Sequence, residues 1–582
     1  MKKFIYIIFT LSSLLFILSC SSSKKEDLTL KIIQTTDIHG TIFPYDFIKN
    51  EPLTNSLANV YSFVKEQRSI FGDNLILLDN GDYLQGQPTV YYYNFEDTST
   101  THLAAEVFNF MKYDATTVGN HDIETGHPVY DKFRRELNAP YLAANAINNL
   151  SGEPYFEPYT IIEKQGIKIA VLGLITPGIP DWLPENLWEG IHFEDMIESA
   201  EKWISIINEK ENPDLIIGMF HAGVDHMYDS KDGAEYMNQN ASKLVAQKVP
   251  GFDIILAGHD HKMYNEKVVN IEGDTVILLD PRSHSRAVSD ITVNFTYNKK
   301  EAKYQKSIDA KIKEIEAIEA DSEFMETFKN QYNAVKNFVS EEIGEFTRSM
   351  DSKDAYFGNS SFIDLIHQIQ LDETHADVSF TSPLSFRGKI EKGPIYISDL
   401  FKLYKFENML YTLSLTGKEI DGFLEYSSSL WFNQMKNKSD HLLKLIVTED
   451  GRTSLKGQYY NCSSAAGINY LINVSKPAGN QVKILGFDNG KRFYLDSSYT
   501  VAVNSYRGNG GGGHLTEGAG LTTEELKNRL IRSSDHDIRY LIMNWIKEKE
   551  TIHPEKGSNW RIIPEDYYEF GKNKDSKALF EE

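Results

Sequence analysis

Cysteine and positive charge are the two things that this sequence has little of. Only two of its 582 residues are cysteines, Cys20 and Cys462. Lysine and arginine total 60 against 83 acidic residues, which gives a formal net charge of −23. This balance argues against a nucleic acid polymer as the main partner, because phosphate backbones are bound by basic surfaces. A local pocket for a small anion is still allowed, and nothing in the sequence indicates a protein partner.

The N-terminus lacks the apolar length of a transmembrane helix. Its apolar run, Phe4–Leu18, follows two lysines and has the length of a signal peptide core. The run ends in Ile17-Leu18-Ser19-Cys20, which resembles a bacterial lipobox. We therefore expect residues 1–19 to be a lipoprotein signal peptide and residues 20–27 to be a polar tether. The alternative is an ordinary signal peptide with an incidental cysteine.

A lipid on Cys20 would have two consequences. The protein would be an exported bacterial lipoprotein, anchored to a membrane through its N-terminus on the periplasmic face or at the cell surface. Cys462 would then be a lone thiol, and no intrachain disulfide could form. We therefore expect large, well-packed domains, because an exported protein without disulfides must be stable through its cores alone.

Apolar runs alternate with helix-like stretches in the first half of the chain. The strand-like runs are Leu30–Thr35, Asn74–Leu78, Ala115–Val118, Lys168–Ile175, Leu215–Phe220, Ile254–Ala257 and Val288–Tyr297. Continuous runs of this kind are typical of strands buried on both faces, with helices such as Asp195–Asn208 and Ala241–Lys248 covering the sheets. The pattern predicts an α/β layered domain over residues 28–304, with functional residues at the strand ends.

The composition changes after this domain. Residues 305–350 are rich in Lys, Glu, Ala and Ile with a weak helical period, so we predict a helical linker there. Strand and helix patterns resume over residues 351–565, where we expect a second domain. Its expected elements are the strands Val378–Thr381, Tyr411–Leu415, Val482–Gly486 and Tyr499–Val503 and the helices Phe362–Leu371, Lys418–Ser427 and Asp535–Glu548. The charged residues 566–582 are expected to form a loose tail.

Five short polar motifs follow apolar runs of the first domain. They are Asp37-Ile38-His39, Gly81-Asp82, Gly119-Asn120-His121-Asp122, His221-Ala222-Gly223 and Gly258-His259-Asp260-His261. Together they supply carboxylates, an amide and imidazoles, which are ligands that divalent transition ions accept. Two such ions held close together can bind both oxygens of an in-line phosphoryl displacement. The set therefore predicts a two-metal hydrolytic site.

Each motif alone has a plainer explanation. Gly-Asp and Gly-Asn pairs are ordinary turn formers, and a histidine after a buried strand is more often a core residue than a ligand. Asp37 and His39 are two residues apart and would point the same way on an extended segment. His259 and His261 have the same spacing, which would be a chelating arrangement on an extended segment. Clusters of ligand types mark metal sites better than single residues do, so the whole set favours a metal site.

Through these motifs, residues from about Leu30 to Asp290 resemble the calcineurin-like metallophosphoesterase superfamily. The whole chain resembles the bacterial periplasmic 5'-nucleotidase / UDP-sugar hydrolase family, as a lipoprotein member. Phe406-Glu407-Asn408 and residues 415–419 carry this resemblance into the second half. The family implies a two-sheet αββα catalytic domain, a helical linker and an α+β C-terminal domain that binds substrate and rotates over the metals.

The resemblance also implies a metal ligand set. One divalent ion would be held by Asp37, His39, Asp82 and His261. The other would be held by Asp82, Asn120, His221 and His259. Asp82 would bridge the ions, and a hydroxide shared between them would be the nucleophile. Zn, Mn, Co and Fe are the candidate metals.

The resemblance assigns further catalytic roles within the third motif. His121 matches the family histidine that stabilises charge on the phosphoryl oxygens or the leaving group, beside the ligand Asn120. The family aspartate that orients this histidine falls at Glu124, which is one methylene longer. Asp122 is a nearer acid in the sequence and an alternative partner for His121.

The phosphate-binding segment of the family matches this chain less well. It aligns with Ser382–Ile390, where Arg387 is retained and the Asn-Gly-Gly-Gly part is absent. A guanidinium group suits a phosphate, so Arg387 is expected to bind substrate. A second family arginine falls near Tyr356 or Gly358, and neither residue is basic.

A glycine-rich loop is expected to bind the rest of the substrate. Tyr506 takes the position of a base-stacking aromatic in the family, and the family aspartate of this loop falls at Gly512. A second stacking ring is expected from Tyr460 or its neighbour Tyr459. Arg507 is a candidate for the positive charge that is otherwise missing from the pocket. For the glycine run by itself, a flexible turn is the plainer interpretation.

The expected function is release of phosphate from nucleoside 5'-monophosphates or related small phosphate esters by attack of a metal-held hydroxide. A 2',3'-cyclic-nucleotide phosphodiesterase or a UDP-sugar pyrophosphatase is the alternative within the enzyme class, because the same metals would serve it. A non-catalytic nucleotide-binding surface lipoprotein is the alternative of another class. The choice of leaving group depends on the second domain, where the departures from the family pattern lie.

Overall fold

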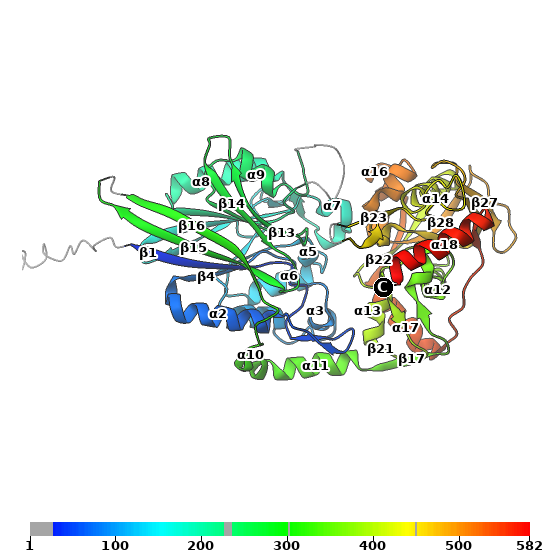
Figure 1. Ribbon diagram of the computed structural model, residues 1–582, viewed down its shortest axis with the longest axis horizontal. Coiled ribbons are helices and arrows are strands. Elements are labelled where there is room, and N and C mark those ends of the chain that lie inside the picture. The colour runs from blue at the N-terminus through cyan, green and yellow to red at the C-terminus, as the bar shows by residue number, and fades with distance from the viewer. Residues whose placement is uncertain (1–26, 226–235, 301–302, 449–450, 582) are drawn as a thin grey trace, which may run out of the picture.

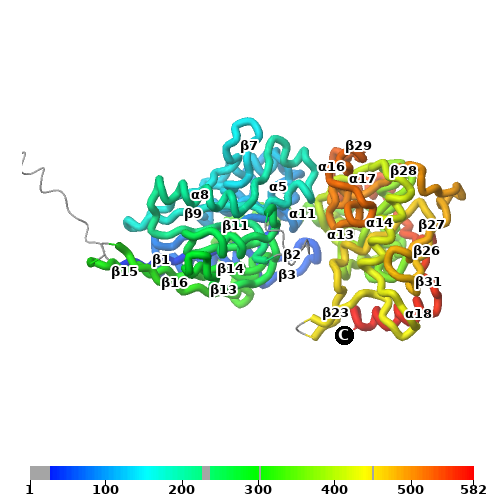
Figure 2. Tube along the Cα trace, turned by 90° about the horizontal axis from the view of Figure 1, so that it is seen from above, coloured from blue at the N-terminus to red at the C-terminus, as the bar shows by residue number. Residues whose placement is uncertain are grey.

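The structure is a computed structural model that describes residues 27–225, 236–300, 303–448 and 451–581. Figure 1 shows two lobes side by side, the first coloured blue to green and the second yellow-green to red. Helix α11 (Lys329–Val339) lies below the first lobe and leads into the second. The trace in Figure 2, seen from above, shows the same two lobes side by side.

The first lobe contains two six-stranded sheets with the orders β16-β15-β1-β4-β5-β6 and β13-β14-β12-β11-β9-β8. The strands of the first sheet are β1 (Leu28–Thr35), β4 (Leu75–Asp79), β5 (Ala115–Thr117), β6 (Tyr141–Leu142), β15 (Ala287–Asn298) and β16 (Lys303–Glu314). Those of the second are β8 (Tyr159–Lys164), β9 (Ile167–Ile175), β11 (Leu215–His221), β12 (Ile254–Ala257), β13 (Met263–Val269) and β14 (Thr275–Pro281). Strands β1-β4-β5-β6 and β14-β12-β11-β9 run parallel, so within each sheet their carboxyl ends share one edge.

The alternation of side chains explains why these strands are apolar throughout. Ile32 packs in the core between the sheets with Val171, whereas the next residue, Ile33, packs in an outer core with helix side chains. Both faces of each central strand are therefore buried. The covering helices include α2 (Leu57–Phe71) and α4 (Leu103–Met111) on one side and α8 (Met196–Lys210) and α9 (Ser242–Lys248) on the other. Figure 1 shows α2 and α8 on opposite sides, which confirms the expected two-sheet αββα layers.

Helix α8 illustrates how local sequence sets these covering helices. Asp195 caps its N-terminus, because the carboxylate accepts hydrogen bonds from the backbone N–H groups of Ile197 and Glu198. Ala200, Trp203, Ile204 and Ile207 are buried at helical spacing, while the charged residues between them face outward. The apolar stripe packs on the second sheet.

The predicted helical linker over residues 305–350 is wrong in its first part. The segment begins inside β16, which pairs with β15 along its whole length. Only α10 (Ser322–Thr327) and α11 are helical, and strand β17 (Glu342–Phe346) follows. In β16 the apolar side chains of Ile308, Ala310 and Ile312 recur at a period of two and pack against the core between the sheets. The Lys-rich and Glu-rich composition concealed this strand period.

The predicted loose tail is also wrong. Residues Glu565–Phe580 form helix α18, and its buried residues Gly571, Asp575 and Leu579 are four apart on one face. Asp575 accepts a hydrogen bond from the Leu443 backbone and pairs with His441. The tail is therefore a docked helix, held by the partners of Asp575 and by the burial of Gly571 and Leu579.

The second lobe has a five-stranded sheet with the order β25-β19-β28-β22-β29. Its strands are β19 (Val378–Thr381), β22 (Met409–Thr416), β25 (Ser464–Ala466), β28 (Ser498–Asn504) and β29 (Leu530–Asp537). Helices α12 (Ser361–Thr374), α14 (Gly417–Trp431) and α17 (Ile538–Lys549) pack around it, and β26 (Ile468–Asn473), β27 (Val482–Phe487) and β31 (Trp560–Ile563) form a small sheet of their own. All of the strands and helices expected for this domain are present; Val378–Thr381 has the predicted bounds, and the others differ at one or both ends.

One buried contact between the lobes centres on Tyr91. This residue ends helix α3 (Pro88–Tyr91) of the first lobe and lies in a core of the second lobe. The Arg539 guanidinium lies 4.8 Å from the Tyr91 ring centroid, and the Phe401 ring packs on Tyr91 edge to face. A second contact joins α7 (Ile179–Trp182) to α15 (Ser505–Gly508).

Cys20 and the predicted signal peptide lie outside the described residues, as does nearly all of the predicted tether. In the part of the chain that the structure does describe, no helix has both the length and the apolar character required to cross a bilayer. Cys462 is a buried free thiol in the second lobe.

The buried His367 is expected to make the stability of the second lobe sensitive to acid. Its two ring nitrogens lie 2.9 Å from the Ser379 hydroxyl and 3.1 Å from the Ser464 hydroxyl, and burial lowers the pKa of this imidazole to about 3. In the unfolded chain the imidazole takes up a proton near pH 6.5, so acid favours unfolding. The stabilisation is present above pH 6.5 and is lost as the pH falls.

We expect His367 to contribute about 2 kcal/mol to the loss of unfolding free energy between pH 6.5 and pH 5. Urea unfolding of wild type and His367→Gln at both pH values measures this contribution, and the variant is expected to lose less stability on acidification. The exposed His553→Gln is the matched control and should behave as wild type. Equal acid sensitivity in His367→Gln and wild type would contradict the assignment.

Candidate active site

The five polar motifs meet at one end of the two facing sheets. Asp37 and His39 follow β1, Asp82 follows β4, and Asn120 and His121 are the first two residues of the short helix α5 (Asn120–Ile123) after β5. His221 is the last residue of β11, and the fifth motif follows β12. Helix α5 lies on the side of the first lobe that faces the second (Figure 1).

The side chains form two groups of potential metal ligands. One group is Asp37, His39, Asp82 and His261. The other is Asp82, His221 and His259. Within each group the ligand atoms lie within 4.8 Å of one another, and Asp82 belongs to both. The amide oxygen of Asn120 lies 3.1 Å from His221 Nε2, which places Asn120 beside the second group.

The donors in this cluster fit divalent ions. Asp82 Oδ2 is buried and accepts no well-formed hydrogen bond, although His221 Nε2 lies 3.2 Å away. The Nε2 atoms of His39 and His261 lie 3.0 Å apart, as two ligands of one ion can. His39 Nδ1 is 3.1 Å from the Gln85 carbonyl and His221 Nδ1 is 2.7 Å from the Asn80 carbonyl, so each ring keeps Nε2 for a metal. Imidazole with carboxylate suits Zn, Mn, Co or Fe.

Burial and neighbouring charges hold Asp37, His39 and His259 in metal-binding protonation states, whereas for His221 the Asp82 carboxylate outweighs burial and raises the pKa to about 10. Burial by itself raises the pKa of Asp37, but the hydrogen bond and charge of His261 outweigh burial and lower that pKa. Burial lowers the pKa of His39 to about 3 with help from His261, and it lowers the pKa of His259 to about 3 with help from His221. Ionised carboxylates and neutral imidazoles are the forms that bind a cation.

The backbone of the ligand turns differs from the expected extended form. Asp37, His39, Asp82, His259 and His261 all have left-handed backbones, with φ of 48°, 49°, 57°, 78° and 58°. Such conformations are uncommon for residues with side chains and concentrate at functional sites. The extended segments assumed for the Asp37/His39 and His259/His261 pairs are therefore wrong. Asp37 and His39 still share one ligand group, whereas His259 and His261 enter different groups. His261 joins Asp37, while His259 joins His221 in the other group.

Glycine is required where these turns approach one another. A Cβ atom on Gly119 would lie 2.2 Å from Asp82 Oδ1, and a Cβ atom on Gly81 would lie 2.7 Å from the Gly119 backbone nitrogen. The absence of side chains lets the second and third motifs pack closely enough to share Asp82.

The structure places His121 against Glu124. His121 Nδ1 lies 2.5 Å from Glu124 Oε2, and the His121 backbone N–H donates to Asp82 Oδ1 at 2.8 Å. Burial alone lowers the pKa of His121, but the carboxylates of Asp82 and Glu124 outweigh it and raise that pKa to about 9. The His121 ring is therefore held as a proton donor beside the metal ligands.

Asp122, the alternative acid partner of His121, binds backbone N–H groups instead. Its carboxylate accepts hydrogen bonds from four backbone N–H groups, those of Gly119, Asp82, Tyr83 and Leu84. These bonds tie the second motif to the third. Asp122 therefore supports the turn that presents Asp82, and Glu124 is the acid in contact with His121.

Two residues expected to bind substrate lie on adjoining loops of the second lobe. Tyr506 is the second residue of the short helix α15. Tyr460 follows Tyr459 in a 3₁₀ turn. Arg507 links the two loops, because its guanidinium donates to the Tyr460 carbonyl at 2.7 Å and to the Gly511 carbonyl at 2.7 Å. The Tyr460 ring lies edge to face with Phe406 at 6.1 Å.

The structure does not favour the anion-binding roles expected for Arg507 and Arg387. Arg507 is 4% exposed, and a Cβ atom on Gly512 would lie 2.0 Å from its Nη1, so the guanidinium fills the space where the family has an aspartate. Arg387 donates to the Leu579 carbonyl at 2.9 Å and lies 5.8 Å from the Phe580 ring centroid. Both guanidinium groups therefore bind backbone carbonyls within the second lobe.

Two aromatic groups beside the metal ligands were not anticipated. The His284 ring lies 5.3 Å from that of His39 and 5.9 Å from that of His261. The Trp182 ring stacks on His259 at 5.5 Å, and its helix α7 contacts α15 of the second lobe. His284 follows the end of strand β14, so it had the same signal as the five motifs, namely a polar residue after an apolar run.

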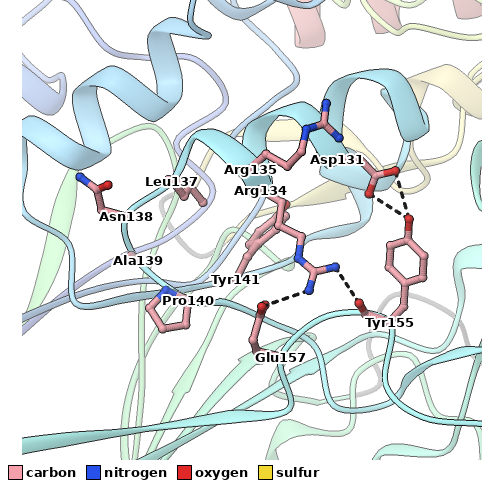
Figure 3. A pocket seen from close by; sticks show the side chains of 10 residues that line it. All are labelled: Asp131, Arg134, Arg135, Leu137, Asn138, Ala139, Pro140, Tyr141, Tyr155 and Glu157. Atoms are coloured by element: carbon pink, nitrogen blue, oxygen red, sulfur yellow. Dashed lines mark hydrogen bonds and ion pairs between the residues drawn. The ribbon is translucent and has the colours of Figure 1, made fainter.

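A cavity of about 630 Å³ on the first lobe is separate from this site (Figure 3). Arg134, Tyr155 and Glu157 are among the residues that line it. Arg134 donates to Glu157 at 3.0 Å and to the Tyr155 carbonyl at 2.7 Å, and the Tyr155 hydroxyl donates to Asp131. These polar groups are already paired, and none of the five motifs contributes to the cavity wall.

Two family models match the chain in the regions of the two lobes. The model described as "Calcineurin-like phosphoesterase" matches residues 30–263, and "5'-nucleotidase, C-terminal domain" matches residues 338–517. The chain is a metal-dependent phosphoesterase of the 5'-nucleotidase family. The two lobes are thus its metallophosphoesterase domain and its 5'-nucleotidase C-terminal domain.

Curated relatives cover nearly the whole chain at low identity. The 2',3'-cyclic-nucleotide 2'-phosphodiesterase/3'-nucleotidase of Haemophilus influenzae is 25% identical over 93% of this chain and 88% of its own length. The 5'-nucleotidase of Vibrio cholerae is 24% identical over 88% of this chain and 91% of its own length. The trifunctional nucleotide phosphoesterase YfkN of Bacillus subtilis is 26% identical over 92% of this chain, which spans only 39% of that protein.

Solved structures show the same two-domain fold. A 5'-nucleotidase homologue from Staphylococcus aureus has a TM-score of 0.75 at 20% identity and covers 92% of this chain and 100% of its own. A 5'-nucleotidase precursor from Thermus thermophilus has a TM-score of 0.61 at 21% identity, with the same shares covered. At these identities the likeness concerns the fold alone.

Replacement of the shared carboxylate is expected to remove metal from both ligand groups. We expect Asp82→Ala to bind less than half of the metal that wild type binds after incubation with Mn(II), and to lose at least about 1000-fold in hydrolytic rate. Mass spectrometric metal analysis of the desalted proteins measures the first effect. Asp131→Ala, a surface acid of the same domain, is the control and should bind metal as wild type does. Full metal content and activity in Asp82→Ala would show that the site is elsewhere.

Proposed function

We propose that the protein releases phosphate from nucleoside 5'-monophosphates or closely related phosphate esters. The observation that carries this proposal is the pair of ligand groups sharing Asp82, with the His121–Glu124 pair beside them. Two bound ions would supply an activated water molecule and stabilise negative charge on the phosphoryl group. Asp37, His39, Asp82 and His261 would hold one ion. Asp82, Asn120, His221 and His259 would hold the other.

His121 and Glu124 have separate roles in this proposal. The raised pKa of His121 keeps its ring protonated near neutral pH, so the ring can donate a hydrogen bond or a proton to an oxygen of the scissile bond. Glu124 fixes the ring through Nδ1, which leaves Nε2 for the substrate. Glu124 is thus a positioning residue in place of the family aspartate.

A nucleoside leaving group is supported by aromatic rings in the second domain. Tyr460 and Tyr506 lie on loops that Arg507 joins, and Phe406 contacts Tyr460. Flat aromatic faces bind nucleobases by stacking. Arg387 and Arg507 were expected to bind the phosphate, but their contacts with carbonyls favour a structural role for both.

The same site could act on a cyclic ester. Several relatives that align along nearly the whole chain are 2',3'-cyclic-nucleotide 2'-phosphodiesterase/3'-nucleotidases, and this favours 2',3'-cyclic nucleotides as the second candidate substrate. UDP-sugars remain a third candidate, because the metals require only a phosphoryl group. A non-catalytic nucleotide-binding protein would not need the His121–Glu124 pair.

A substrate panel distinguishes these candidates. We expect metal-loaded protein beginning at residue 21 to hydrolyse AMP and UMP faster than UDP-glucose and a generic aryl phosphate. We expect His121→Ala to lower kcat by about 100- to 10,000-fold with its metal content unchanged, because general acid catalysis contributes a factor of this size. A preference for 2',3'-cAMP would replace the 5'-nucleotidase assignment with the second candidate. No turnover of any compound by metal-loaded wild type would contradict the catalytic proposal.

The N-terminus supports a proposal about location. The lipobox-like sequence ending at Cys20 is consistent with export and lipid attachment. In a bacterial host we expect wild type in the membrane fraction after labelling with a fatty acid. Cys20→Ser should lose the label and leave that fraction, whereas Cys462→Ser should keep both. A labelled Cys20→Ser variant would exclude Cys20 as the lipid site.

A further inference from the structure

If the second domain helps to bind a phosphate, it must place a positively charged side chain beside the metal site. Arg387 and Arg507 bind backbone carbonyls. A third arginine, Arg539, is buried and lies 3.4 Å from the buried carboxylate of Glu407. Its other N–H groups donate to backbone carbonyls of the segment before Glu407. Arg507 and Arg539 are buried in these contacts, whereas the exposed Arg387 is directed at the end of helix α18 through its bond to Leu579.

Arg539 instead fixes the position of a lysine. Lys405 lies in the connection between α13 (Ile397–Leu403) and strand β22. Its carbonyl accepts a hydrogen bond from Arg539 at 2.7 Å, and the preceding carbonyl of Tyr404 accepts another at 3.1 Å. Because Arg539 also packs on Tyr91 of the first domain, the contact between the domains holds this connection in place.

The connection follows helix α13, which lies on the side of the second domain next to the first. Figures 1 and 2 both show α13 on the side of the second domain that faces the first. Burial is the main cause of the lowered pKa of His284, whose ring packs beside His39 and His261, and the Lys405 ammonium is near enough for its charge to add to this effect. Glu407, two residues later, is likewise near enough to Glu124 for the two carboxylates to repel.

Lys405 has no counterion among the described residues. No described carboxylate lies within ion-pair distance of its ammonium, and the contact it does make is with the Phe406 ring at 5.7 Å. The Lys405 side chain is exposed to solvent, but nearby protein atoms displace part of the hydration shell of its ammonium. This desolvation lowers the pKa of Lys405. A partly desolvated ammonium without a counterion is a favourable place for an anion.

We propose that Lys405 is a substrate-binding residue that contacts the phosphoryl oxygens from the second domain, in the role expected for Arg387 and Arg507, which donate to backbone carbonyls instead. This inference rests on the proposed phosphohydrolase function. Lys405 is a compact charge on a flexible stem, so it can follow the phosphoryl group without the fixed geometry of an arginine. Such a contact favours ligands with two negative charges on one phosphate.

The charge of the ester then affects substrate preference. A phosphate monoester is largely a dianion above pH 7, because its second pKa is near 6. A 2',3'-cyclic phosphodiester carries one negative charge. Removal of the Lys405 charge should therefore lower kcat/KM for monoesters more than for cyclic diesters.

Two measurements test the proposal. Calorimetric titration of Mn(II)-loaded protein with inorganic phosphate is expected to show about 10- to 100-fold weaker binding for Lys405→Met than for wild type. In steady-state kinetics, KM for AMP should rise by a similar factor with a smaller change in kcat, and kcat/KM for 2',3'-cAMP should fall less. Lys405→Arg, which keeps the charge, should stay within about threefold of wild type in both assays. Lys418→Met is the matched control, because Lys418 is an exposed lysine of the same domain, and it should match wild type.

The outcomes separate this inference from the proposed function. If Lys405→Met binds inorganic phosphate and AMP as wild type does, or if wild type binds no phosphate, the inference is wrong. If metal-loaded wild type hydrolyses no ester, the proposed function fails, and the phosphate titration still decides the role of Lys405. A loss of phosphate binding in Lys418→Met equal to that in Lys405→Met would also overturn the inference.

Discussion

The carboxylate of Asp82 joins every part of the catalytic domain that takes part in chemistry. One oxygen accepts a hydrogen bond from the backbone of His121, and the other lies 3.9 Å from His39 Nε2 and 3.2 Å from His221 Nε2. Burial of this ionised group is unfavourable on its own, and the neighbouring imidazoles of His221 and His121 offset the cost. Because His39 follows a strand of one sheet and His221 ends a strand of the other, the shared carboxylate requires both sheets to keep their relative position.

The rest of the fold supplies that constraint. Central strands buried on both faces form a rigid layer, and the tight turns beyond them hold Asp37, His39, Asp82, His259 and His261 in left-handed conformations. The second domain meets this layer through Tyr91 and Arg539, and the same arginine positions Lys405. The metal-ligand cluster, the contact between the domains and the proposed phosphate contact of Lys405 are therefore mechanically connected.

Much of the fold and the ligand set could be predicted from the sequence, because apolar runs ending in polar motifs directly reflect strands and their edges. Strand Ile254–Ala257 has the predicted bounds. The strand period of Ile308 and Ile312 was hidden by lysines between them, and the helix face of Asp575 and Leu579 was hidden in a charged tail. The contacts of Arg387 and Arg507 with carbonyls, and the unpaired charge of Lys405, depend on loops distant in sequence. Motif spacing contains no information about such contacts.

Anomalous diffraction from crystals of the Mn(II)-loaded protein tests the central claim most directly. The account predicts two anomalous peaks in each molecule. One should lie against Asp37, His39 and His261, the other against His221 and His259, and Asp82 should contact both. A single peak, or two peaks of which one does not touch Asp82, would contradict it.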